Sequence, residues 1–341
     1  MGGAPTEVSH RSLPGRAPTE RRPVAPDPEP LAERGGVVAV EMDDPDQLGV
    51  ALELLDAAET AAGLPLVDES ERHRLEQLAS GAASRDEAWR SVLAWADSHP
   101  VGYGAVVLDA TGVSVGDAAT DGGPPAAEAL RALLGAIVEI GRRGGAGRLQ
   151  VWTRHAGQAQ VDAAAAEGFE VERRLAVMGR GLAGGVPEAP AGSATVRAYR
   201  PGEDDEAVVD VLARAYEGTG DAGWDLAVFR ERTRLPWFRS QDLLVAELPG
   251  GDGPALAGLH WLKRRTETQG EVYNLAVHPD AQGRGVGPTL LHAGLAHLLE
   301  IGCDDVLLWV DLANTRAVGL YESQGFEVRW QDLALGRTAG T

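Results

Sequence analysis

A glycine-rich turn at residues 282–288 has the residue types that a phosphate-binding loop needs. It reads Gln-Gly-Arg-Gly-Val-Gly-Pro and lies between an apolar stretch that ends near Val277 and a helical pattern that begins near Val286. Glycine admits backbone angles closed to other residues and leaves the main-chain amides uncovered. With the free amides and the positive dipole end of the following helix, such a turn can hold a diphosphate. A flexible turn without a ligand is the alternative on these residues alone.

The pattern Q-x-x-G-x-G in this turn differs from two other nucleotide-binding motifs. The dinucleotide fingerprint needs G-x-G-x-x-G, and the phosphate loop of nucleotide hydrolases ends in Gly-Lys followed by Ser or Thr. Neither motif occurs at residues 282–288.

Two side chains near the turn could accept or donate a proton. Glu271 stands at the start of the strand that leads into the turn, where a carboxylate can act as a general base, directly or through water. Tyr321 follows Asn314 by seven residues, so two helical turns bring both onto one side of a helix. An ordinary strand-end carboxylate, and core packing of Tyr321 beside Phe326, stay open as alternatives.

An internal duplication positions these residues. The segment AEGFEVERRLAVMGR from Ala166 parallels SQGFEVRWQDLALGR from Ser323, and their phenylalanines are 157 residues apart. The segment from Val37 parallels the one from Thr195, 158 residues away. A common offset at both ends indicates two tandem domains rather than a repeat array. We expect a disordered proline- and arginine-rich tail at 1–35, a first domain at 36–180, a linker at 181–193 and a second domain at 194–337.

Each half has the same expected order of strand, one or two helices, several strands, helix, strand, helix and final strand. In the second half, we expect strands near 195–199, 242–248, 255–263, 271–278, 305–311 and 326–335, and helices near 203–217, 225–234, 286–301 and 315–324. Strands grouped before a strand-helix-strand crossover predict an α/β or α+β fold, with a mixed, mostly antiparallel sheet flanked by helices.

Composition narrows the classes of partner and compartment. The formal net charge of the 341 residues is −20, which argues against nucleic acid and anionic membrane surfaces as partners. Cys303 is the only cysteine, so we expect no intrachain disulfide and no multi-cysteine metal site. The sequence has neither an apolar run of about 20 residues nor a signal-peptide pattern. We therefore expect a soluble cytoplasmic protein without a bound metal.

The Q-x-x-G-x-G turn, with its strand and helix, resembles the coenzyme A pyrophosphate loop of the GNAT superfamily of N-acetyltransferases. The segment NTRAVGLYESQGFEV at 314–328 resembles the second signature of that superfamily. The stretches 256–291 and 232–247 resemble, more narrowly, the mycothiol synthase family, which has two GNAT domains in tandem. This resemblance covers residues 37–337, strongly in the second half and faintly in the first. It implies acetyl-CoA as the co-substrate.

The resemblance also implies a set of cofactor-binding positions in the second half. The strand that receives the thioester, the phosphate loop and a further coenzyme A segment correspond to Leu275, Ala276, Val277, Gln282, Gly283, Arg284, Gly285, Val286, Gly287, Pro288, Asn314, Thr315, Arg316, Ala317, Val318 and Gly319. Amides around Leu275–Val277 would hold a developing oxyanion, which requires that strand to splay from its neighbour. Glu271 would be the base, and Tyr321 would donate a hydrogen bond to the departing thiolate.

The acceptor positions implied by the resemblance match in part. Lys263 and Glu271 match positions that contact the acceptor. The family's His-Pro-Glu-Gln turn reads Thr219-Gly220-Asp221-Ala222 here, so Asp221 replaces a longer glutamate. Trp309 replaces a tyrosine, which exchanges a hydroxyl group for an indole N–H.

The first domain departs from the cofactor-binding pattern. Where the amide cradle should be, residues 115–140 contain Asp117, Asp121 and a Pro-Pro pair. Carboxylates would repel a diphosphate, so we expect one functional cofactor site per chain. Asp68 or Glu69 falls near a carboxylate that the resemblance places at the acceptor, and this domain is expected to form a wall of the acceptor site.

The family implies a specific reaction, and other acceptors stay open. Mycothiol synthases acetylate the cysteinyl amine of a cysteine-glucosamine-inositol conjugate in the last step of mycothiol synthesis. An acidic groove around Asp68, Asp221 and Glu271 would favour a cationic acceptor. Alternatives are another small amine, an aminoglycoside or a peptide N-terminus, and a non-catalytic acetyl-CoA-binding regulator. Because tandem domains can complete within one chain the packing that single domains obtain by dimerising, a monomer is expected.

Overall fold

The computed structural model describes residues 29–42, 44–109, 113–123, 125–186, 194–219, 221–250 and 253–338. The first half begins with two short strands and two helices, continues with three strands, and ends with helix, strand, helix and strand. These elements are β1 (Ala32–Arg34), β2 (Val37–Glu41), α1 (Pro45–Ala62), α2 (Glu69–Ala79), β3 (Trp89–Ala96), β4 (His99–Val107), β5 (Val113–Thr120), α3 (Ala126–Arg143), β6 (Arg148–Ala156), α4 (Gln158–Ala166) and β7 (Glu170–Gly181).

The second half repeats this order from its own first strand. Its elements are β8 (Thr195–Ala198), α5 (Asp205–Ala215), α6 (Leu226–Arg232), β9 (Leu243–Glu247), β10 (Gly258–Arg264), β11 (Gln269–Val277), α7 (Val286–Glu300), β12 (Asp305–Asp311), α8 (Thr315–Ser323) and β13 (Glu327–Thr338). Every strand and helix predicted for this half is found within a few residues of its expected place.

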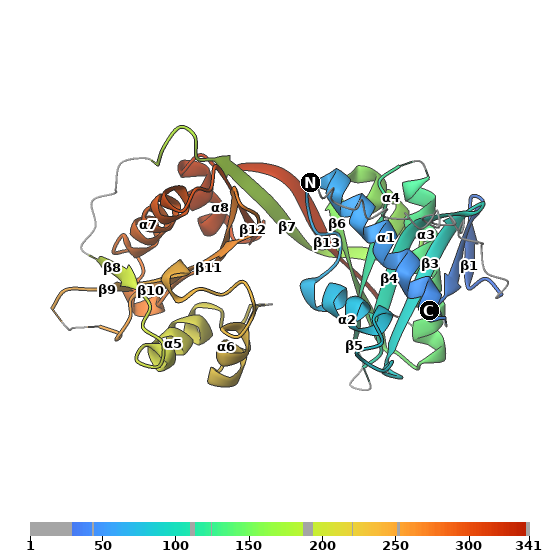
Figure 1. Ribbon diagram of the computed structural model, residues 1–341, viewed down its shortest axis with the longest axis horizontal. Helices are drawn as coiled ribbons and strands as arrows, with labels where there is room; N and C mark the ends of the chain where they lie inside the picture. Colours follow the sequence, from blue (N-terminus) through green and yellow to red (C-terminus); the bar gives the residue numbers. More distant parts are fainter. Residues whose placement is uncertain are drawn as a thin grey trace, which may run out of the picture.

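The described strands form one sheet. Their order is β1-β2-β3-β4-β5-β6-β13-β7-β12-β11-β10-β9-β8, and neighbours are antiparallel except in the pairs β5–β6 and β11–β12. Helices cover both faces of the sheet in each half (Figure 1). The expected mixed, mostly antiparallel sheet flanked by helices is confirmed.

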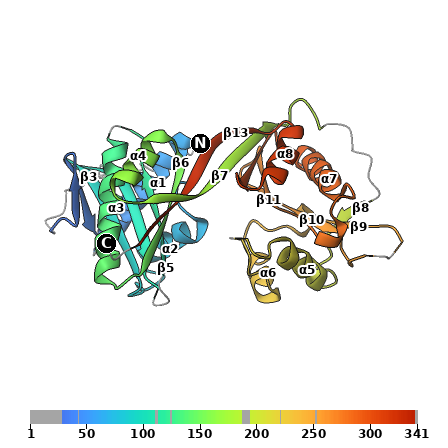
Figure 2. The ribbon, with the colours of Figure 1, turned by 180° about the vertical axis from the view of Figure 1, so that it is seen from behind.

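The last strand of each half pairs with the sheet of the other half. β7 pairs with β12 through residues 175–181, and β13 pairs with β6 through residues 331–338. The two strands also pair with each other, and Figures 1 and 2 show them crossing side by side between the halves. Each half therefore has its sheet completed by the other. The linker at 181–193 stays a prediction, and its residues 187–193 lie outside the described part of the chain.

The predicted disordered tail at 1–35 extends too far at its C-terminal end. Residues 1–28 lie outside the described residues, whereas Ala32–Arg34 forms β1 and pairs with β2. Gly35 and Gly36, with φ of 56° and 82°, make the tight turn between these strands, which glycine allows without strain. The Arg34 side chain then donates to Glu167 at 2.7 Å. The sequence pattern does not reveal β1 because this strand is only three residues long.

In the second half, different helices pack on the two faces of the sheet. Helices α7 and α8 pack on the face that carries Val272 and Leu308. Helices α5 and α6 pack on the other face, around the fully buried Trp261. Because side chains alternate along a strand, Glu271 and Trp309 point to the α5–α6 side.

Candidate active site

The parallel pair β11–β12 opens in the middle of the second half's sheet. The strands pair from Gln269↔Asp305 to Val272↔Leu308, and no further pair joins these two described strands, although β11 continues to Val277. A bulge in β11 falls at this point, because Trp261 of β10 pairs with Asn274 while Leu262 pairs with Val272. The two strands therefore separate after Val272.

Two main-chain amides of β11 point into the gap. The N–H of His278 donates to Ala257 O at 3.0 Å, on the β10 side. Hydrogen bonds alternate along an antiparallel ladder, so Ala276 also faces β10, and Leu275 and Val277 face the opposite way. The carbonyl oxygen of Ala276 indeed lies against Gly258 of β10. The splay that an oxyanion site at Leu275–Val277 requires is thus present.

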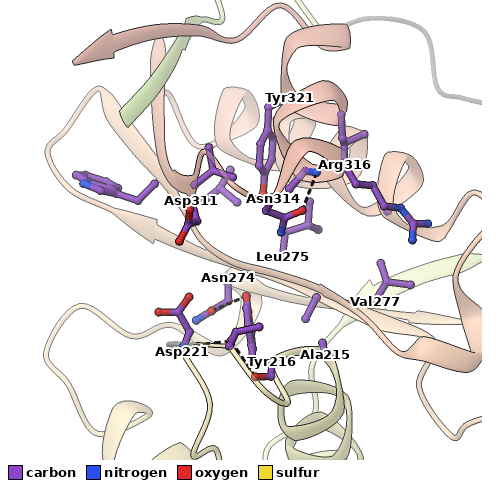
Figure 3. Close-up of a pocket in the computed structure, with 18 of the residues that line it drawn as sticks. Ala215, Tyr216, Asp221, Asn274, Leu275, Val277, Asp311, Asn314, Arg316 and Tyr321 are labelled. Atoms are coloured by element: carbon purple, nitrogen blue, oxygen red, sulfur yellow. Dashed lines mark hydrogen bonds between the residues drawn. The ribbon is translucent and has the colours of Figure 1, made fainter. Parts of the chain in front are cut away.

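A cavity of about 1160 Å³ occupies this gap (Figure 3). Its walls come from β11, β12, α5, α6, α8, the turn before α7, and the strand β7 supplied by the first half. The predicted site residues that line it are Asp221, Leu275, Ala276, Val277, Gln282, Gly283, Gly285, Val286, Gly287, Pro288, Trp309, Asn314, Arg316, Ala317 and Tyr321. The predicted residues Asp68, Lys263, Glu271, Arg284, Thr315, Val318 and Gly319 are placed outside this lining.

The glycine turn has the geometry of an anion cradle. Gly283 and Gly285 have φ of 76° and 77°, angles that side chains rarely adopt. Gly285 is the N-cap residue of α7, and no side chain caps this helix end, so its first amides are left for a ligand. Arg316 of α8 donates to Gln282 Oε1 at 2.6 Å and brings positive charge to the turn. These residues fit a diphosphate.

Helix α8 supplies the phenol of the site. Asn314 caps the helix by accepting from Ala317 N at 3.1 Å, and Tyr321 lies two turns further along. Figure 3 shows the Tyr321 ring extending from α8 toward Leu275 on β11. The ring also packs edge-on against Phe326, with centroids 5.7 Å apart. The packing of Tyr321 beside Phe326 is therefore confirmed, whereas its hydrogen bond to a departing thiolate stays a prediction. Burial raises the pKa of its phenol above the ordinary value.

Glu271 lies on β11 one residue before the part of the strand that lines the cavity. It is 8% exposed, and its Oε2 accepts from Arg265 Nη1 at 2.8 Å. The Arg265 guanidinium carbon lies 5.3 Å from the ring centroid of Trp309, which does line the cavity. Glu271 is therefore connected to the cavity wall through a cation.

The three carboxylates predicted to form an acidic groove differ in exposure: the side chains of Asp68 and Asp221 are 56% and 62% exposed, and that of Glu271 is 10% exposed. Each of the three carboxylates has a cationic partner within the protein. The pairs are Asp68 with Arg154, Asp221 with Arg173 and Glu271 with Arg265, at 3.8, 3.7 and 2.8 Å. Lys263 pairs with Glu69 at 2.9 Å and lies 4.8 Å from the Trp237 ring centroid. Gly220, in the predicted 219–222 turn, lies outside the described residues.

Trp309 presents its ring to the cavity and uses its N–H elsewhere. The indole Nε1 donates to Asp332 Oδ2 at 2.9 Å. Asp332 belongs to β13, is 2% exposed, and also accepts from His155 N at 3.0 Å. The N–H that replaces the family's tyrosine hydroxyl is therefore already satisfied by a buried carboxylate.

Four residues that the sequence did not single out also line the cavity. Arg173 of β7 donates to Asp311 Oδ2 at 3.0 Å. The Tyr216 hydroxyl donates to Asn274 Oδ1 at 3.0 Å, and Figure 3 shows these two side chains. Tyr216 lies four residues after the buried Leu212, so the helical pattern could have indicated it. Arg173 carries no such signal, because it reaches the cavity only through the exchange of β7.

The first half contains a counterpart of the opening without the glycine turn. Its parallel pair β5–β6 ends at Asp117↔Trp152, although both strands continue. Asp117 is 7% exposed and lies 3.5 Å from Arg154. Asp121 accepts from Gly123 N at 3.1 Å within its own turn. Asp121 thus lies in the turn that corresponds to the cradle, and Asp117 lies on the strand before that turn.

None of the helices described is long and apolar enough to cross a membrane. Among the described residues, no group of three or more His, Cys, Asp or Glu side chains has an arrangement that could hold a metal ion.

Comparisons with known proteins agree with this architecture. Residues 206–326 match the model of the acetyltransferase (GNAT) family. A mycothiol acetyltransferase of Actinosynnema mirum is 37% identical over 300 residues, which cover 84% of this chain and 94% of the relative. Another, of Geodermatophilus obscurus, is 35% identical over 322 residues, which cover 86% of this chain and 96% of the relative.

Two solved structures share the fold. A GCN5-related N-acetyltransferase from Sphaerobacter thermophilus matches with a TM-score of 0.65 at 18% identity, over 90% of this chain and 97% of its own. A tandem GNAT protein from the clavulanic acid biosynthesis pathway matches with a TM-score of 0.62 at 18% identity, over 89% of this chain and 99% of its own.

Proposed function

Because this chain belongs to the mycothiol acetyltransferase family of GNAT proteins, we propose that it transfers the acetyl group of acetyl-CoA directly to the cysteinyl amine of a cysteine-glucosamine-inositol conjugate. The observation that carries the reaction class is the opening of β11–β12 after Val272, beside the glycine turn. Uncovered amides and a helix N-terminus meet there in one cavity of about 1160 Å³. Acetyl-CoA supplies the activated acetyl group when it is bound.

The glycine turn is the proposed diphosphate site. The first amides of α7 and those exposed by Gly283 and Gly285 face the cavity, where the helix dipole favours negative charge. Arg316, held by Gln282, adds a charge-assisted hydrogen-bond donor. In this proposal the chain binds the co-substrate mainly through its backbone.

The opened strand and the phenol are the proposed stabilisers of developing charge. The amides of Leu275 and Val277 are aimed into the gap, where they can bind the pantetheine arm and the thioester oxygen. Tyr321 donates a hydrogen bond to the sulfur as the carbon–sulfur bond breaks. Because burial raises its pKa, the phenol stays protonated, and the thiolate takes its proton from solvent after transfer.

Glu271 is the proposed base. An α-amino group titrates near about 8, so a weak base is sufficient, and the proton reaches Glu271 through an intervening water. Asp311 lines the cavity itself, but its two oxygens accept from Arg173 Nε at 3.0 Å and from Ala313 N at 2.9 Å. Because both oxygens of Asp311 already accept hydrogen bonds within the protein, Glu271 is the better candidate for the base.

The polar groups near the acceptor favour a second candidate, in which the chain acetylates a different amine. Trp309 has no free N–H for a sugar hydroxyl, because Asp332 accepts it, and Asp221 is shorter than the family's glutamate. A site that loses polar partners discriminates less strongly among hydroxylated acceptors. Another small amine, an aminoglycoside or a peptide N-terminus would then be acetylated by the same residues.

The decisive experiment offers several amines to the purified full chain. Acetyl-CoA is supplied with the cysteine-glucosamine-inositol amine, an aminoglycoside or a short peptide, and mass spectrometry follows gain of one acetyl group on each. We expect the gain on the first, and a large loss of rate in Glu271→Gln. Acetylation of another amine only would replace the acceptor and keep the reaction class. Acetylation of none would contradict the proposed activity.

A further inference from the structure

Arg265, just after β10, makes two contacts at the edge of the candidate active site. Its Nη1 donates to Glu271 Oε2 at 2.8 Å, and its guanidinium carbon lies 5.3 Å from the Trp309 ring centroid. Trp309 lines the cavity, and Glu271 is the proposed base. Arg265 therefore lies between the proposed proton acceptor and the cavity wall.

Burial makes both contacts consequential. The side chains of Arg265 and Glu271 are 19% and 10% exposed. A carboxylate at such a depth is strongly destabilised without a charged partner, and an aromatic face attracts a guanidinium group more strongly where water is excluded. Arg265 is both the charged partner of Glu271 and the guanidinium group that lies over the Trp309 ring.

The aromatic surface under Arg265 is itself anchored. Trp309 Nε1 donates to Asp332, which is 2% exposed and also accepts from the backbone of His155. The hydrogen bond to the buried Asp332 carboxylate thus holds the indole ring in place. A continuous series of contacts runs from Asp332 through Trp309 and Arg265 to Glu271.

We propose that Arg265, stacked on Trp309, is the positioning residue that orients the Glu271 carboxylate for proton transfer. This inference rests on the proposed function. Arg265 occupies one oxygen, Oε2, and within the described residues no donor is found for Oε1. Oε1 is therefore the oxygen that receives the proton of the acceptor amine through the intervening water.

A matched control lies next to Arg265 in the chain. Arg264 is exposed, donates from Nε to Thr266 O at 3.2 Å, and also donates to Glu267 O. It supports the β10–β11 turn without contacting Glu271. If Arg265 only held this turn, Arg264→Gln would reproduce the effect of Arg265→Gln.

The test compares Arg265→Gln, Arg265→Lys and Arg264→Gln in the full chain, by steady-state kinetics and thermal unfolding. Misplacement of a base costs on the order of 10- to 100-fold, so Arg265→Gln should lower kcat by about that factor without changing KM for acetyl-CoA. Arg265→Lys keeps the charge without the planar stack and should recover part of the loss. Arg264→Gln should leave kcat unchanged. If Arg265→Gln unfolds, Arg265→Met keeps apolar contact with Trp309 and serves in its place.

The same changes in the Glu271→Gln background decide the mechanism. A residue that acts through Glu271 has no further effect once that carboxylate is absent, so the two losses should not add. Additive losses, or an equal loss in Arg264→Gln, would overturn the positioning role while the wild-type chain still acetylates its amine. A wild-type chain that acetylates no amine would instead overturn the proposed function, and the two failures are thereby distinguished.

Discussion

Gly294 of α7 lies so close to His260 of β10 that a methyl group at position 294 would stand 2.1 Å from the imidazole Nδ1. His260 is fully buried, and its Nδ1–H donates to Leu290 O at 2.8 Å. This contact joins the helix that begins at the glycine turn to the sheet. The position of the cradle therefore depends on a glycine two turns away from it.

Gly294→Ala should destabilise the protein. The added methyl group must displace a buried ring, which costs about 1 to 3 kcal/mol and exceeds the gain in helix propensity. Gly49→Ala in α1 is the matched control, because no atom lies within 4 Å of the place that its new methyl group would take, and it should stabilise by up to about 1 kcal/mol. Urea unfolding measures both. Equal stability of the two variants would contradict the close helix–strand contact.

Stability should fall on acidification because of His260. Burial lowers the pKa of His260 to about 4, so the folded state favours the neutral ring. The associated stability is present above the ordinary pKa of about 6.5 and is lost as the pH falls toward 4, with about 2 kcal/mol lost by pH 5. Chemical unfolding at several pH values tests this. His260→Gln should show a flatter profile between pH 8 and pH 5, and an unchanged slope would rule the histidine out.

Asp117→Asn should stabilise the protein at alkaline pH. Burial raises the pKa of Asp117 to about 7, although Arg154 opposes the shift. Since the folded pKa lies above the ordinary value, this group's contribution is present at low pH and is lost as the pH rises through 7. Asparagine removes that loss, which begins above the ordinary pKa of about 3.9 and reaches about 1.5 kcal/mol at pH 5 and about 4 kcal/mol at pH 8. We therefore expect the substitution to stabilise the protein by about 2.5 kcal/mol more at pH 8 than at pH 5. A gain of the same size at both pH values would contradict the titration.

Gly287→Leu should strongly weaken coenzyme A binding without unfolding the chain. A Cβ at position 287 would lie 3.6 Å from Val277 and 3.8 Å from Leu320, which are ordinary contacts, but the rest of the side chain enters the cavity. We expect the dissociation constant to rise by about 100-fold, or about 3 kcal/mol. Calorimetry should find one site per wild-type chain. Gly49→Leu, remote from the cavity, is the control that should bind normally.

Tyr321→Phe should lower kcat and preserve the fold. Phenylalanine keeps the edge-on contact with Phe326 and removes only the hydroxyl group. Loss of a hydrogen-bond donor to the leaving sulfur should reduce kcat by about 10- to 100-fold, with KM for acetyl-CoA little changed. Single-turnover kinetics isolate the chemical step. An unaffected rate would leave Tyr321 with its packing role alone.

The elements around the cradle could be predicted because their signals are local. The strand that ends at Val277, the glycines of 282–288 and the helix after them form one continuous segment, so their order largely fixes their geometry. The opening of β11 could be stated only as a requirement of the chemistry. The bulge that produces it depends on how Trp261 and Leu262 pair with β11, which no local pattern reveals.

Long-range partners could not be predicted in this way. The segments after Phe169 and Phe326 predict two final strands, but either sheet edge offers them the same backbone hydrogen bonds. Sequence alone therefore could not show that Arg173 reaches the cavity of the other half. The same holds for Arg265, since its contact with Glu271 depends on the turn that brings the chain back after β10.

The crossing of β7 and β13 also determines what a break in the backbone would do. A single cut between Val186 and Ala194 leaves two fragments, each of which still carries a strand inserted in the other's sheet. To come apart they would have to strip out both strands and expose two long unpaired edges to solvent. The duplicated halves are thus interlocked by the strands that they exchange, and neither half can be removed as an independent domain.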